Sequence, residues 1–464
     1  MSDLVVAANR GPATFVVDDA GRLVPRHGAG GLAPSLAKAI AGSGATWVAA
    51  AMSEGDRLAA TRGEEALLGG GISLRLVELA PEVQSAAYQV VANATLWFLH
   101  HGLFDASRRP VLDRHWHEAW TAFRAYNDAF AEAIMASADD GATVVVHDYH
   151  LPLVGARLAA ERPDLATVHF SHTPFCSPGE LGVLPRAVAR ELLASMASFG
   201  SCGFHTARWE ASFRACATEV LGEAPVTFHS ALGVDAAELA EVSASPGCSA
   251  RRAELLGRLD GRRLLFRSDR IELSKNLLRG FLAFEELLEA RPDWRGRVVF
   301  IARAYQSRGE LAEYRAYRNE VTHLAERINE RFPAAEPHVR LEVEDDFEAS
   351  VAALSCYDVL LVNPVRDGMN LVAKEGPVVN GRAGVLALSR EAGAFAELGS
   401  DALEVEPFDV SGTAATLLAG LEMEPGERRA RAERLAGVAG SRPPAVWFAE
   451  VRSRAARPVG TPRA

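Results

Sequence analysis

Short apolar runs alternate with amphipathic segments along the whole chain. In the first half, the apolar runs predict buried parallel strands at Leu4–Ala8, Thr46–Ala51, Thr143–Val146, Ala166–Phe170 and Ser201–Phe204. Between these strands, apolar positions at helical spacing predict helices at Leu32–Ile40, Trp116–Ala136, Pro152–Glu161 and Ala187–Ala197. Such alternation of strand and helix predicts an α/β fold with doubly wound parallel sheets.

The second half repeats this pattern. It predicts strands at Arg263–Phe266, Arg297–Ile301, Val339–Val343, Val359–Val362, Val385–Ala387 and Ala402–Val405. It predicts helices at Leu277–Ala290, Tyr314–Arg331, Phe347–Leu354 and Val410–Met423. Two Rossmann-like halves imply a cleft that the carboxyl ends of both sheets face.

The length of the chain indicates more than one domain. At 464 residues it exceeds one hydrophobic core, so two domains of roughly 200 residues each are expected. Ser, Ala, Pro and Gly become frequent in Glu238–Arg252, and we place the linker just before this stretch, near Leu232–Ala237. The expected division is 1–235, 236–440, and a tail of 441–464 whose helix, around Ala445–Ala456, packs back on the first domain.

Composition narrows the class of protein. Hydrophobic residues make up 48% and charged residues 23%, and the net charge is −11, which disfavours a general nucleic-acid or membrane-surface binder. The five cysteines show no zinc-type or disulfide spacing, which favours a reducing compartment. The N-terminus lacks a signal-peptide pattern and no apolar run is long enough for a membrane helix. We therefore expect a cytoplasmic protein.

The segment Arg366–Glu375 carries the most chemical information. It follows the apolar run Val359–Val362 and reads as a strand, a tight turn at Gly368, and the first turns of a helix. A helix opening at about Met369–Val372 offers free N–H groups to an anion. Asp367 and Glu375 add carboxylates that suit sugar hydroxyls. This combination is typical of a nucleotide-sugar site, and the alternative is an ordinary strand–helix junction with an acidic cap.

Basic residues follow several of the predicted strands. Arg270 and Lys275 lie five apart across a turn, and Arg308 follows the next strand, so these three are expected to gather at one edge of a sheet. Their charges would stabilise a departing diphosphate. In the first half, Arg10 follows a strand in the same way, and the Gly28–Leu32 turn precedes a helix without matching a dinucleotide fingerprint. Surface ion pairs and a structural loop are the alternatives.

Histidines and one aspartate follow two further strands. His147-Asp148-Tyr149-His150 and His169-Phe170-Ser171-His172 resemble no metal-ligand signature, so sugar contacts by Asp148 and His172 are preferred over a metal. Neither a GxSxG turn nor a cysteine with an evident base is present. A glycosidase-type carboxylate pair is disfavoured because Asp367 and Glu375 are eight residues apart.

Together these segments resemble the trehalose-6-phosphate synthases of glycosyltransferase family 20, which have two-domain GT-B architecture. The resemblance runs from about Leu4 to Phe448. It is carried by Asn9-Arg10, Gly30-Gly31-Leu32, Tyr88 with Asn93–Trp97, His147–His150, His172–Phe175, Arg270–Lys275, Ser307–Gly309 and Arg366–Glu375. It implies a retaining glycosyltransferase that moves glucose from UDP- or GDP-glucose to glucose 6-phosphate, with no protein nucleophile, no cofactor and no metal.

The resemblance also implies a role for each matching residue. The acceptor would be bound by Arg10, Tyr88, Trp97, Asp148 and Arg308. The donor would be bound by Gly30, Gly31, Arg270, Lys275, Phe347, Asp367, Gly368, Met369, Asn370, Leu371, Val372 and Glu375. The residues nearest the chemistry would be Asp148, His172, Arg270, Lys275 and Asp367. The expected partners are small-molecule substrates, without nucleic acid or membrane, and a homo-oligomer is compatible with the sequence.

Some positions depart from the family pattern. The usual Arg-Leu-Asp-Tyr-Ser-Lys-Gly is here Arg270-Ile271-Glu272-Leu273-Ser274-Lys275-Asn276, and the usual Ser-Asn-Arg and His-Ile-Pro are Ala8-Asn9-Arg10 and His172-Thr173-Pro174. These changes leave the nucleotide of the donor and the identity of the acceptor open. The alternatives are a related synthase, such as a glucosylglycerol-phosphate synthase or a cyclitol pseudo-glycosyltransferase, and a silent sugar-phosphate sensor. The sensor ranks lowest because Arg270, Lys275, Asp367 and Glu375 are all present.

Overall fold

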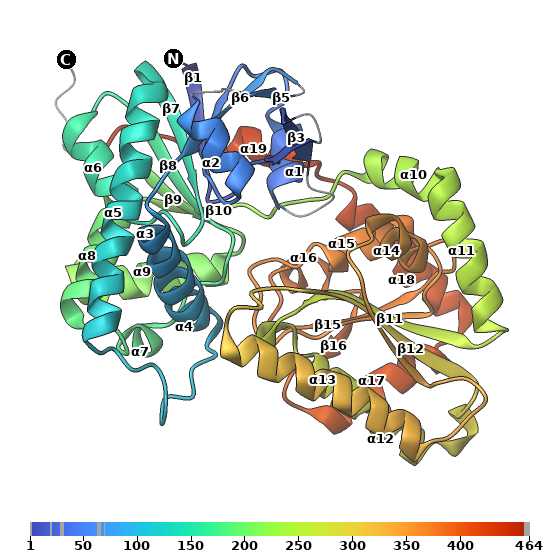
Figure 1. Ribbon diagram of the computed structural model, residues 1–464. Helices are drawn as coiled ribbons and strands as arrows, with labels where there is room; N and C mark the ends of the chain where they lie inside the picture. The colour runs from blue at the N-terminus through green and yellow to red at the C-terminus, as the bar shows by residue number, and fades with distance from the viewer. Residues whose placement is uncertain (1, 19–20, 28–31, 63–65, 69, 459–464) are drawn as a thin grey trace. The chain divides into compact units, whose positions relative to one another are not determined.

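The computed structural model describes residues 2–18, 21–27, 32–62, 66–68 and 70–458 (Figure 1). The chain forms two compact units. The first unit contains Met1–Ala231 together with Pro444–Ala464, and the second contains Leu232–Pro443. The chain therefore passes from one unit to the other twice, and α19 near the C-terminus belongs to the first unit.

The first unit is built on a sheet in the strand order β10-β9-β8-β7-β1-β4-β6-β5, with a separate β2–β3 hairpin. All neighbours in the sheet are parallel except β5, which pairs antiparallel with β6 at the edge. Its elements are β1 (Ser2–Ala7), β2 (Ala13–Val17), β3 (Leu23–His27), α1 (Leu32–Ala39), β4 (Thr46–Ala50), α2 (Glu54–Thr61), β5 (Ala66–Leu68), β6 (Ile72–Val77), α3 (Pro81–Ser85), the π-helix η1 (Ala86–Leu96), α4 (Trp97–His101), α5 (Arg114–Ser137), β7 (Ala138–His147), α6 (Val154–Glu161), β8 (Ala166–Ser171), α7 (Pro178–Leu181), α8 (Arg186–Ala197), β9 (Ser201–Phe204), α9 (Ala207–Leu221), β10 (Thr227–His229) and α19 (Pro444–Ser453).

The second unit is an all-parallel sheet in the order β13-β12-β11-β14-β15-β16. Its elements are α10 (Ala236–Ala244), α11 (Pro246–Leu259), β11 (Arg263–Ile271), η2 (Leu273–Lys275), α12 (Leu277–Ala290), η3 (Pro292–Trp294), β12 (Val298–Gln306), α13 (Ala312–Arg331), β13 (Val339–Val343), α14 (Phe347–Leu354), β14 (Val359–Val362), α15 (Val372–Val379), β15 (Val385–Ser389), α16 (Phe395–Leu398), β16 (Leu403–Val405), α17 (Val410–Glu422) and α18 (Pro425–Ala439). Within this unit, α12, α13 and α17 cover one face of the sheet, and α14, α15 and α18 cover the other (Figure 1).

Buried aliphatic and aromatic side chains form the core of each sheet. In the second unit, Leu265, Phe300 and Leu361 lie on neighbouring strands and are fully buried against Phe281 and Phe284 of α12. Strands that are buried on both faces require continuous apolar runs, which is the pattern that predicted them. The two parallel sheets with helices on both faces confirm the α/β prediction.

Both sheets reverse their strand order at a defined point. In the first unit the chain builds outward from β1 through β4 to β6, and then returns to place β7 on the other side of β1. In the second unit β14 is placed beside β11 in the same way. Ligands of open α/β sheets bind at the carboxyl ends of the strands that flank such a switch point. The residues that follow β1, β7, β11 and β14 are therefore the first candidates for function.

Two segments differ from the prediction. The helix after β14 begins at Val372, whereas the sequence predicted free N–H groups from Met369 onward. The residues before it stay outside the helix because Met369 O and Asp367 O are bonded to the segment that follows β15. The Ser-, Ala-, Pro- and Gly-rich stretch Glu238–Arg252 is helical, within α10 and α11. Ser245 separates these two helices and caps the second, because its hydroxyl accepts from the N–H of Cys248.

Candidate functional site

Arg10 and Tyr88 lie together in the first unit. The turn after β1 is anchored by the buried Asn9, which accepts a 2.5 Å hydrogen bond from the hydroxyl of Tyr126. Arg10 is exposed, and its Nη2 lies 3.3 Å from the hydroxyl of Tyr88, which belongs to η1. Tyr88 also stacks on His150, with ring centroids 5.7 Å apart. An exposed guanidinium beside a phenol hydroxyl suits a phosphate group.

The π-helix η1 determines where Tyr88 and Trp97 lie. Such helices bond each N–H to the carbonyl five residues back and occur often at functional sites. Asn93 accepts from the Tyr149 hydroxyl at 3.1 Å, and Thr95 accepts from the Trp116 indole at 3.0 Å. Trp97 follows directly, is 2% exposed, and stacks on His101 with centroids 4.2 Å apart. Trp97 thus lies in the core of this unit.

Asp148 joins the ends of β7 and β8. Its backbone is left-handed, with a φ of 69°, and its N–H donates to Phe170 O at 2.8 Å. Its Oδ1 accepts from the N–H groups of His172, at 3.1 Å, and Thr173, at 3.3 Å. The carboxylate is therefore held by the backbone of the segment that carries His172.

Three imidazoles near Asp148 form a hydrogen-bonded chain. His147 Nδ1 lies 3.1 Å from His172 Nε2, and His172 Nδ1 lies 3.1 Å from His205 Nε2. Both ring nitrogens of His172 are thus engaged. The indole of Trp447, from α19, lies beside the chain, with its centroid 5.7 Å from that of His172.

Burial keeps His147, His169 and His172 neutral. Burial, reinforced by neighbouring histidines, lowers the pKa of His147 to about 3 and that of His172 well below its usual range. Burial also lowers the pKa of His169 to about 4, although the carbonyl of Asp148 opposes this. A neutral imidazole has one donor and one acceptor nitrogen, so His172 donates to one of its two histidine neighbours and accepts from the other.

Lys275 and Asp367 form the centre of the candidate site in the second unit. Lys275 Nζ lies 2.5 Å from Asp367 Oδ2, and the two residues follow the neighbouring strands β11 and β14. Burial opposes the charge of Lys275, but Asp367 and Asp269 outweigh it and raise the pKa of the ammonium group. Asn370 Nδ2 donates to the same carboxylate oxygen at 3.1 Å. A cation thus lies next to a carboxylate that can accept hydrogen bonds from sugar hydroxyls.

The buried Arg267 holds the backbone of Lys275, and the sequence pattern did not single it out. Its side chain is 1% exposed and donates to Asp269 Oδ2 at 2.7 Å and to Lys275 O at 2.7 Å. It also donates to Asn363 Oδ1 at 3.1 Å. A Cβ on Gly280 would lie 2.7 Å from Arg267 Nη1, so this glycine provides the space. In the sequence, the indication of its role was a charged residue placed directly after the apolar run of a predicted strand.

Asn276 occupies the position where the family has glycine. Its backbone is left-handed, with φ 61° and ψ 41°, which glycine adopts without cost and asparagine tolerates better than most residues. Its Nδ2 donates to Asn363 O at 3.0 Å and to Pro407 O at 2.7 Å. The departure therefore keeps the backbone geometry and adds two buried hydrogen bonds.

The turn before α15 is bound to the loop that follows β15. Gly393 N–H donates to Asp367 O at 3.1 Å, and Ala394 N–H donates to Met369 O at 2.8 Å. A Cβ on Gly393 would lie 1.9 Å from Gly368 O, so the two backbones touch. Among the described residues, no acceptor pairs with the N–H groups of Leu371 or Val372. These two groups remain available to an anion at the start of the helix.

Glu375 and Phe347 lie in different surroundings. Glu375 is half-buried in the first turn of α15, and burial together with nearby Glu238 raises its pKa to about 7. At that pKa the protonated and ionised forms coexist at neutral pH, and the ionised form can accept hydrogen bonds from hydroxyl groups. Phe347 begins α14 and packs against the cluster that contains Val234 and Leu239.

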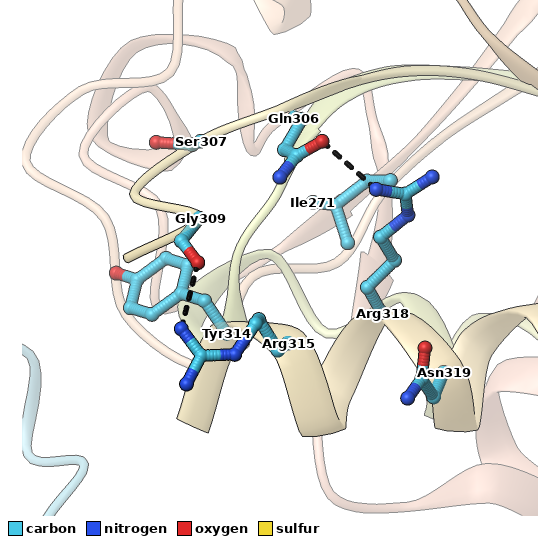
Figure 2. A pocket seen from close by; sticks show the side chains of 8 residues that line it. All are labelled: Ile271, Gln306, Ser307, Gly309, Tyr314, Arg315, Arg318 and Asn319. Atoms are coloured by element: carbon cyan, nitrogen blue, oxygen red, sulfur yellow. Dashed lines mark hydrogen bonds between the residues drawn. The ribbon is translucent and has the colours of Figure 1, made fainter. Parts of the chain in front are cut away.

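Arg308 is held by neighbours of its own unit. Its Nη1 lies 2.7 Å from Glu272 Oε1 and 2.9 Å from the Tyr314 hydroxyl, and its side chain is 9% exposed. A cavity of about 200 Å³ lies beside the loop that carries Arg308, and Figure 2 shows the residues that line it. It is lined by Ile271, Gln306, Ser307, Gly309, Tyr314, Arg315, Arg318 and Asn319.

Three predicted residues remain: Gly30, Gly31 and Arg270. Gly30 and Gly31 lie outside the described residues. Arg270 is the last residue but one of β11 and pairs with Glu272, with Nη1 3.0 Å from Oε1. Of the predicted donor residues, Lys275 and Asp367 follow the strands of the β11–β14 switch point, and of the predicted acceptor residues, Arg10 and Asp148 follow those of the β1–β7 switch point.

The described residues also bear on metal, thiol and membrane functions. Within the described parts of the chain, no group of three or more His, Cys, Asp or Glu is arranged to hold a metal ion. All five cysteines are buried and free. Every helix in those parts is too short or too polar to cross a lipid bilayer.

Comparisons with known proteins identify the family of the chain. The model of glycosyltransferase family 20 matches residues 2–457. A bifunctional trehalose-6-phosphate synthase/phosphatase of Thermoproteus tenax is 33% identical over 385 residues, covering 79% of this chain and 51% of that protein. The chain spans about half or less of this relative and of two from Arabidopsis thaliana (39% and 44%).

Other relatives match over most of their length. A trehalose-6-phosphate synthase of Mycolicibacterium smegmatis is 30% identical, covering 93% of this chain and 88% of that protein. A glucosylglycerol-phosphate synthase of Synechocystis is 28% identical, covering 94% and 93%.

Solved structures match the whole fold. An E. coli structure bound with UDP-2-fluoro glucose has a TM-score of 0.84 at 26% identity, covering 97% of this chain and 98% of that one. A UDP-forming α,α-trehalose-phosphate synthase of Burkholderia xenovorans, in complex with glucose-6-phosphate, has a TM-score of 0.83 at 27% identity, covering 97% and 99%. Since the family model spans nearly the whole chain and the two sheets match the fold of these enzymes, the chain belongs to glycosyltransferase family 20.

Proposed function

We propose that the chain transfers glucose from a nucleoside-diphosphate glucose to glucose 6-phosphate and forms α,α-trehalose 6-phosphate. The observation that carries the proposal is the contact between Lys275 and Asp367, which sets a cation for a diphosphate against an acceptor for sugar hydroxyls. The Arg10–Tyr88 pair adds a second phosphate-type site. The Mycolicibacterium relative and the ligands of the E. coli and Burkholderia structures support the same substrates.

In the proposed mechanism the anomeric configuration is retained without a protein nucleophile. The departing phosphate takes the proton of the acceptor hydroxyl on the same face of the sugar, while the new glycosidic bond forms. Lys275 and Arg270 stabilise the charge that develops on the diphosphate, which is the contribution a divalent metal would make elsewhere. The N–H groups of Leu371 and Val372 add donors at the start of α15. No metal or cofactor is therefore proposed.

The carboxylates of the second unit would orient the donor. Asp367, already bonded to Lys275 and Asn370, would accept from hydroxyls of the glucose. Glu375 would accept from the hydroxyls of the ribose. Fixing the donor in this way turns the reaction into one between oriented partners, which accounts for a large part of the rate in group transfer.

A second candidate function differs only in the acceptor. The Synechocystis glucosylglycerol-phosphate synthase covers this chain as fully as the trehalose-6-phosphate synthases do. Its name implies an acceptor smaller than a hexose phosphate. Arg10, Tyr88 and Arg308 suit a phosphate on either acceptor.

A matrix of donors and acceptors tests the proposal. UDP-, GDP- and ADP-glucose are each combined with glucose 6-phosphate, glycerol 3-phosphate and free glucose, with and without a chelator. We expect product with glucose 6-phosphate, in the α,α configuration by NMR, and no effect of the chelator. Lys275→Ala serves as the control that lowers turnover without abolishing donor binding. Product only with glycerol 3-phosphate would select the second candidate, and no transfer from any donor would refute both.

A further inference from the structure

Glu272 contacts two arginines that the proposed function gives to different substrates. Its Oε1 lies 3.0 Å from Arg270 Nη1, on the donor side, and 2.7 Å from Arg308 Nη1, on the acceptor side. The same oxygen accepts from the Ser307 hydroxyl at 2.9 Å. We propose that Glu272 is a positioning residue that holds both guanidinium groups at the separation required by the two phosphate-bearing substrates. This inference rests on the proposed function.

The backbone places Glu272 where its side chain can reach both arginines. It follows the last residue of β11, and its carbonyl accepts from Lys275 N–H at 3.0 Å. Arg308 belongs to the loop after β12, the next strand of the sheet. The side chain of Glu272 therefore crosses from the end of one strand to the loop after its neighbour. Aspartate, the usual residue here in the family pattern, is one methylene shorter.

The environment keeps this carboxyl group ionised. Glu272 is fully buried, which alone would raise its pKa, but Arg270, Arg308 and Lys275 outweigh burial and lower the pKa to about 2. The carboxylate thus offsets the repulsion between two guanidinium groups that meet at one oxygen atom. Without it, each arginine would be free to move away from the other.

The bonds of Glu272 converge on one of its two oxygens. Among the described residues, Oε2 is buried and has no hydrogen-bond partner. A buried carboxylate oxygen without a donor is costly, so the three contacts at Oε1 must compensate for it. A buried carboxylate oxygen that lacks a donor, beside one that has three contacts, is typical of a residue that maintains the geometry of a site.

Direct binding measurements test the inference without relying on turnover. Calorimetric titrations with UDP and with glucose 6-phosphate are carried out on the wild type, Glu272→Gln and Glu272→Asp. We expect Glu272→Gln to weaken both ligands by about 10-fold, since a charge-assisted contact to each arginine is lost. Glu272→Asp keeps the charge but loses reach, so it should weaken at least one ligand.

Double variants separate positioning from general damage. In an Arg270→Ala background, Glu272→Gln should no longer affect UDP but should still weaken glucose 6-phosphate. In an Arg308→Ala background the pattern should reverse. A residue that only stabilised the fold would have the same effect in every background. Glu342→Gln, which breaks a different Glu–Arg pair in the same sheet, serves as the matched control and should change neither ligand.

The outcomes distinguish this inference from the proposed function. If the wild type binds neither UDP nor glucose 6-phosphate, the proposed function is wrong. If it binds both, but Glu272→Gln affects one ligand only or gives the same effect in both backgrounds, the positioning role is wrong. Tighter binding of either ligand by Glu272→Gln would show that the carboxylate competes with phosphate, which also overturns the inference. If Glu272→Gln does not fold, Glu272→Asp takes its place: its effect on a ligand should disappear when the arginine assigned to that ligand is replaced by alanine, and an unchanged effect would overturn the inference.

Discussion

Arg308 combines an unusual backbone with an enclosed side chain. Its φ is 46°, in the left-handed region that residues with a side chain seldom adopt. Such strain persists where neighbouring contacts compensate for it, and here Glu272 and Tyr314 both bind the guanidinium. The head group is thus held in place before any ligand arrives, as expected of a residue that recognises a phosphate.

Replacing Arg308 tests its predicted role at the acceptor. Arg308→Ala should raise the KM for glucose 6-phosphate about 10- to 150-fold, because a charge-assisted contact to phosphate is lost. The KM for the nucleotide sugar should stay unchanged. Arg429→Ala removes an exposed arginine of α18 and serves as the control in the same steady-state assay. Equal increases in both KM values would contradict the role.

Glu375 predicts how stability depends on pH. Its pKa is raised from about 4.5 to about 7 in the folded protein, so the folded state holds this proton more tightly than the unfolded state does. Its contribution to stability is present below about pH 4.5 and is lost as the pH rises through about 7. Glu375→Gln should therefore flatten the fall in the free energy of unfolding across this window.

Denaturant titrations at pH 5, 6, 7 and 8 measure this effect. The exposed Glu320→Gln serves as the control and should follow the wild-type curve. If Glu375→Gln also follows the wild-type curve, then the carboxyl group is already ionised at low pH and the raised pKa is wrong.

The sequence could predict several residues of the candidate site but not the buried residues that hold them in place. Lys275 and Asp367 follow strands that are adjacent in a doubly wound sheet, so their proximity follows from topology. Arg267 and Glu272 could not be identified, because their importance lies in partners that packing brings together from distant segments. His205 could not be identified for the same reason, because its contact with His172 comes from packing. In the sequence it is a histidine that follows a predicted strand.

At the scale of whole elements, strand and helix positions were predicted better than their ends. Helix α12, Leu277–Ala290, has the predicted bounds, and Asn276 in left-handed conformation marks its start. Strand β11 continues to Ile271, five residues beyond the prediction, although its last part is polar. It remains a strand because the buried ion pair of Arg267 and Asp269 satisfies that polar part. The π-helix η1 was not predicted, since no periodic signal distinguishes it from an α-helix.

Helix α19 should determine the stability of the first unit. Trp447 is fully buried, and its indole N–H donates to Ser230 O at 3.1 Å. Its ring packs edge-to-face with that of Phe170, with ring centroids 4.9 Å apart. Trp447→Ala should cost about 3–5 kcal/mol, as large-to-small changes in a core do. Calorimetry should show the loss as a lower melting temperature.

The neighbouring residue provides the control. Val446 lies on the same helix and is 55% exposed, so Val446→Ala should change the melting temperature little. If Trp447→Ala leaves the melting transition unchanged, α19 does not contribute to the folded first unit.

At the scale of the molecule, the second unit is an insertion in the first. The two ends of the second unit lie together, since a Cβ on Gly233 would lie 1.7 Å from Arg442 O. Lys374, which is buried and paired with Glu397, donates to Leu232 O at 2.8 Å and holds the first of these ends. Units whose ends are close together are often able to fold alone.

Excision tests this arrangement. A fragment comprising Leu232–Pro443 should unfold cooperatively and bind UDP, because the residues proposed for the diphosphate and ribose, other than the Gly30–Gly31 turn, lie within it. Circular dichroism melting and calorimetry check both expectations. The variant Lys374→Ala of this fragment should melt at a lower temperature, and a fragment without a cooperative transition would contradict the independence of the unit.

The late position of Trp447 in the chain has a consequence for biosynthesis. During translation, residues 1–231 leave the ribosome long before α19 is made. The hydrogen-bonded row of His147, His172 and His205 therefore first forms without the neighbouring indole of Trp447. The inserted unit is complete before the first unit can be. A nascent chain interrupted anywhere before residue 447 thus carries an unfinished first unit, and quality control that senses exposed apolar surface would remove it.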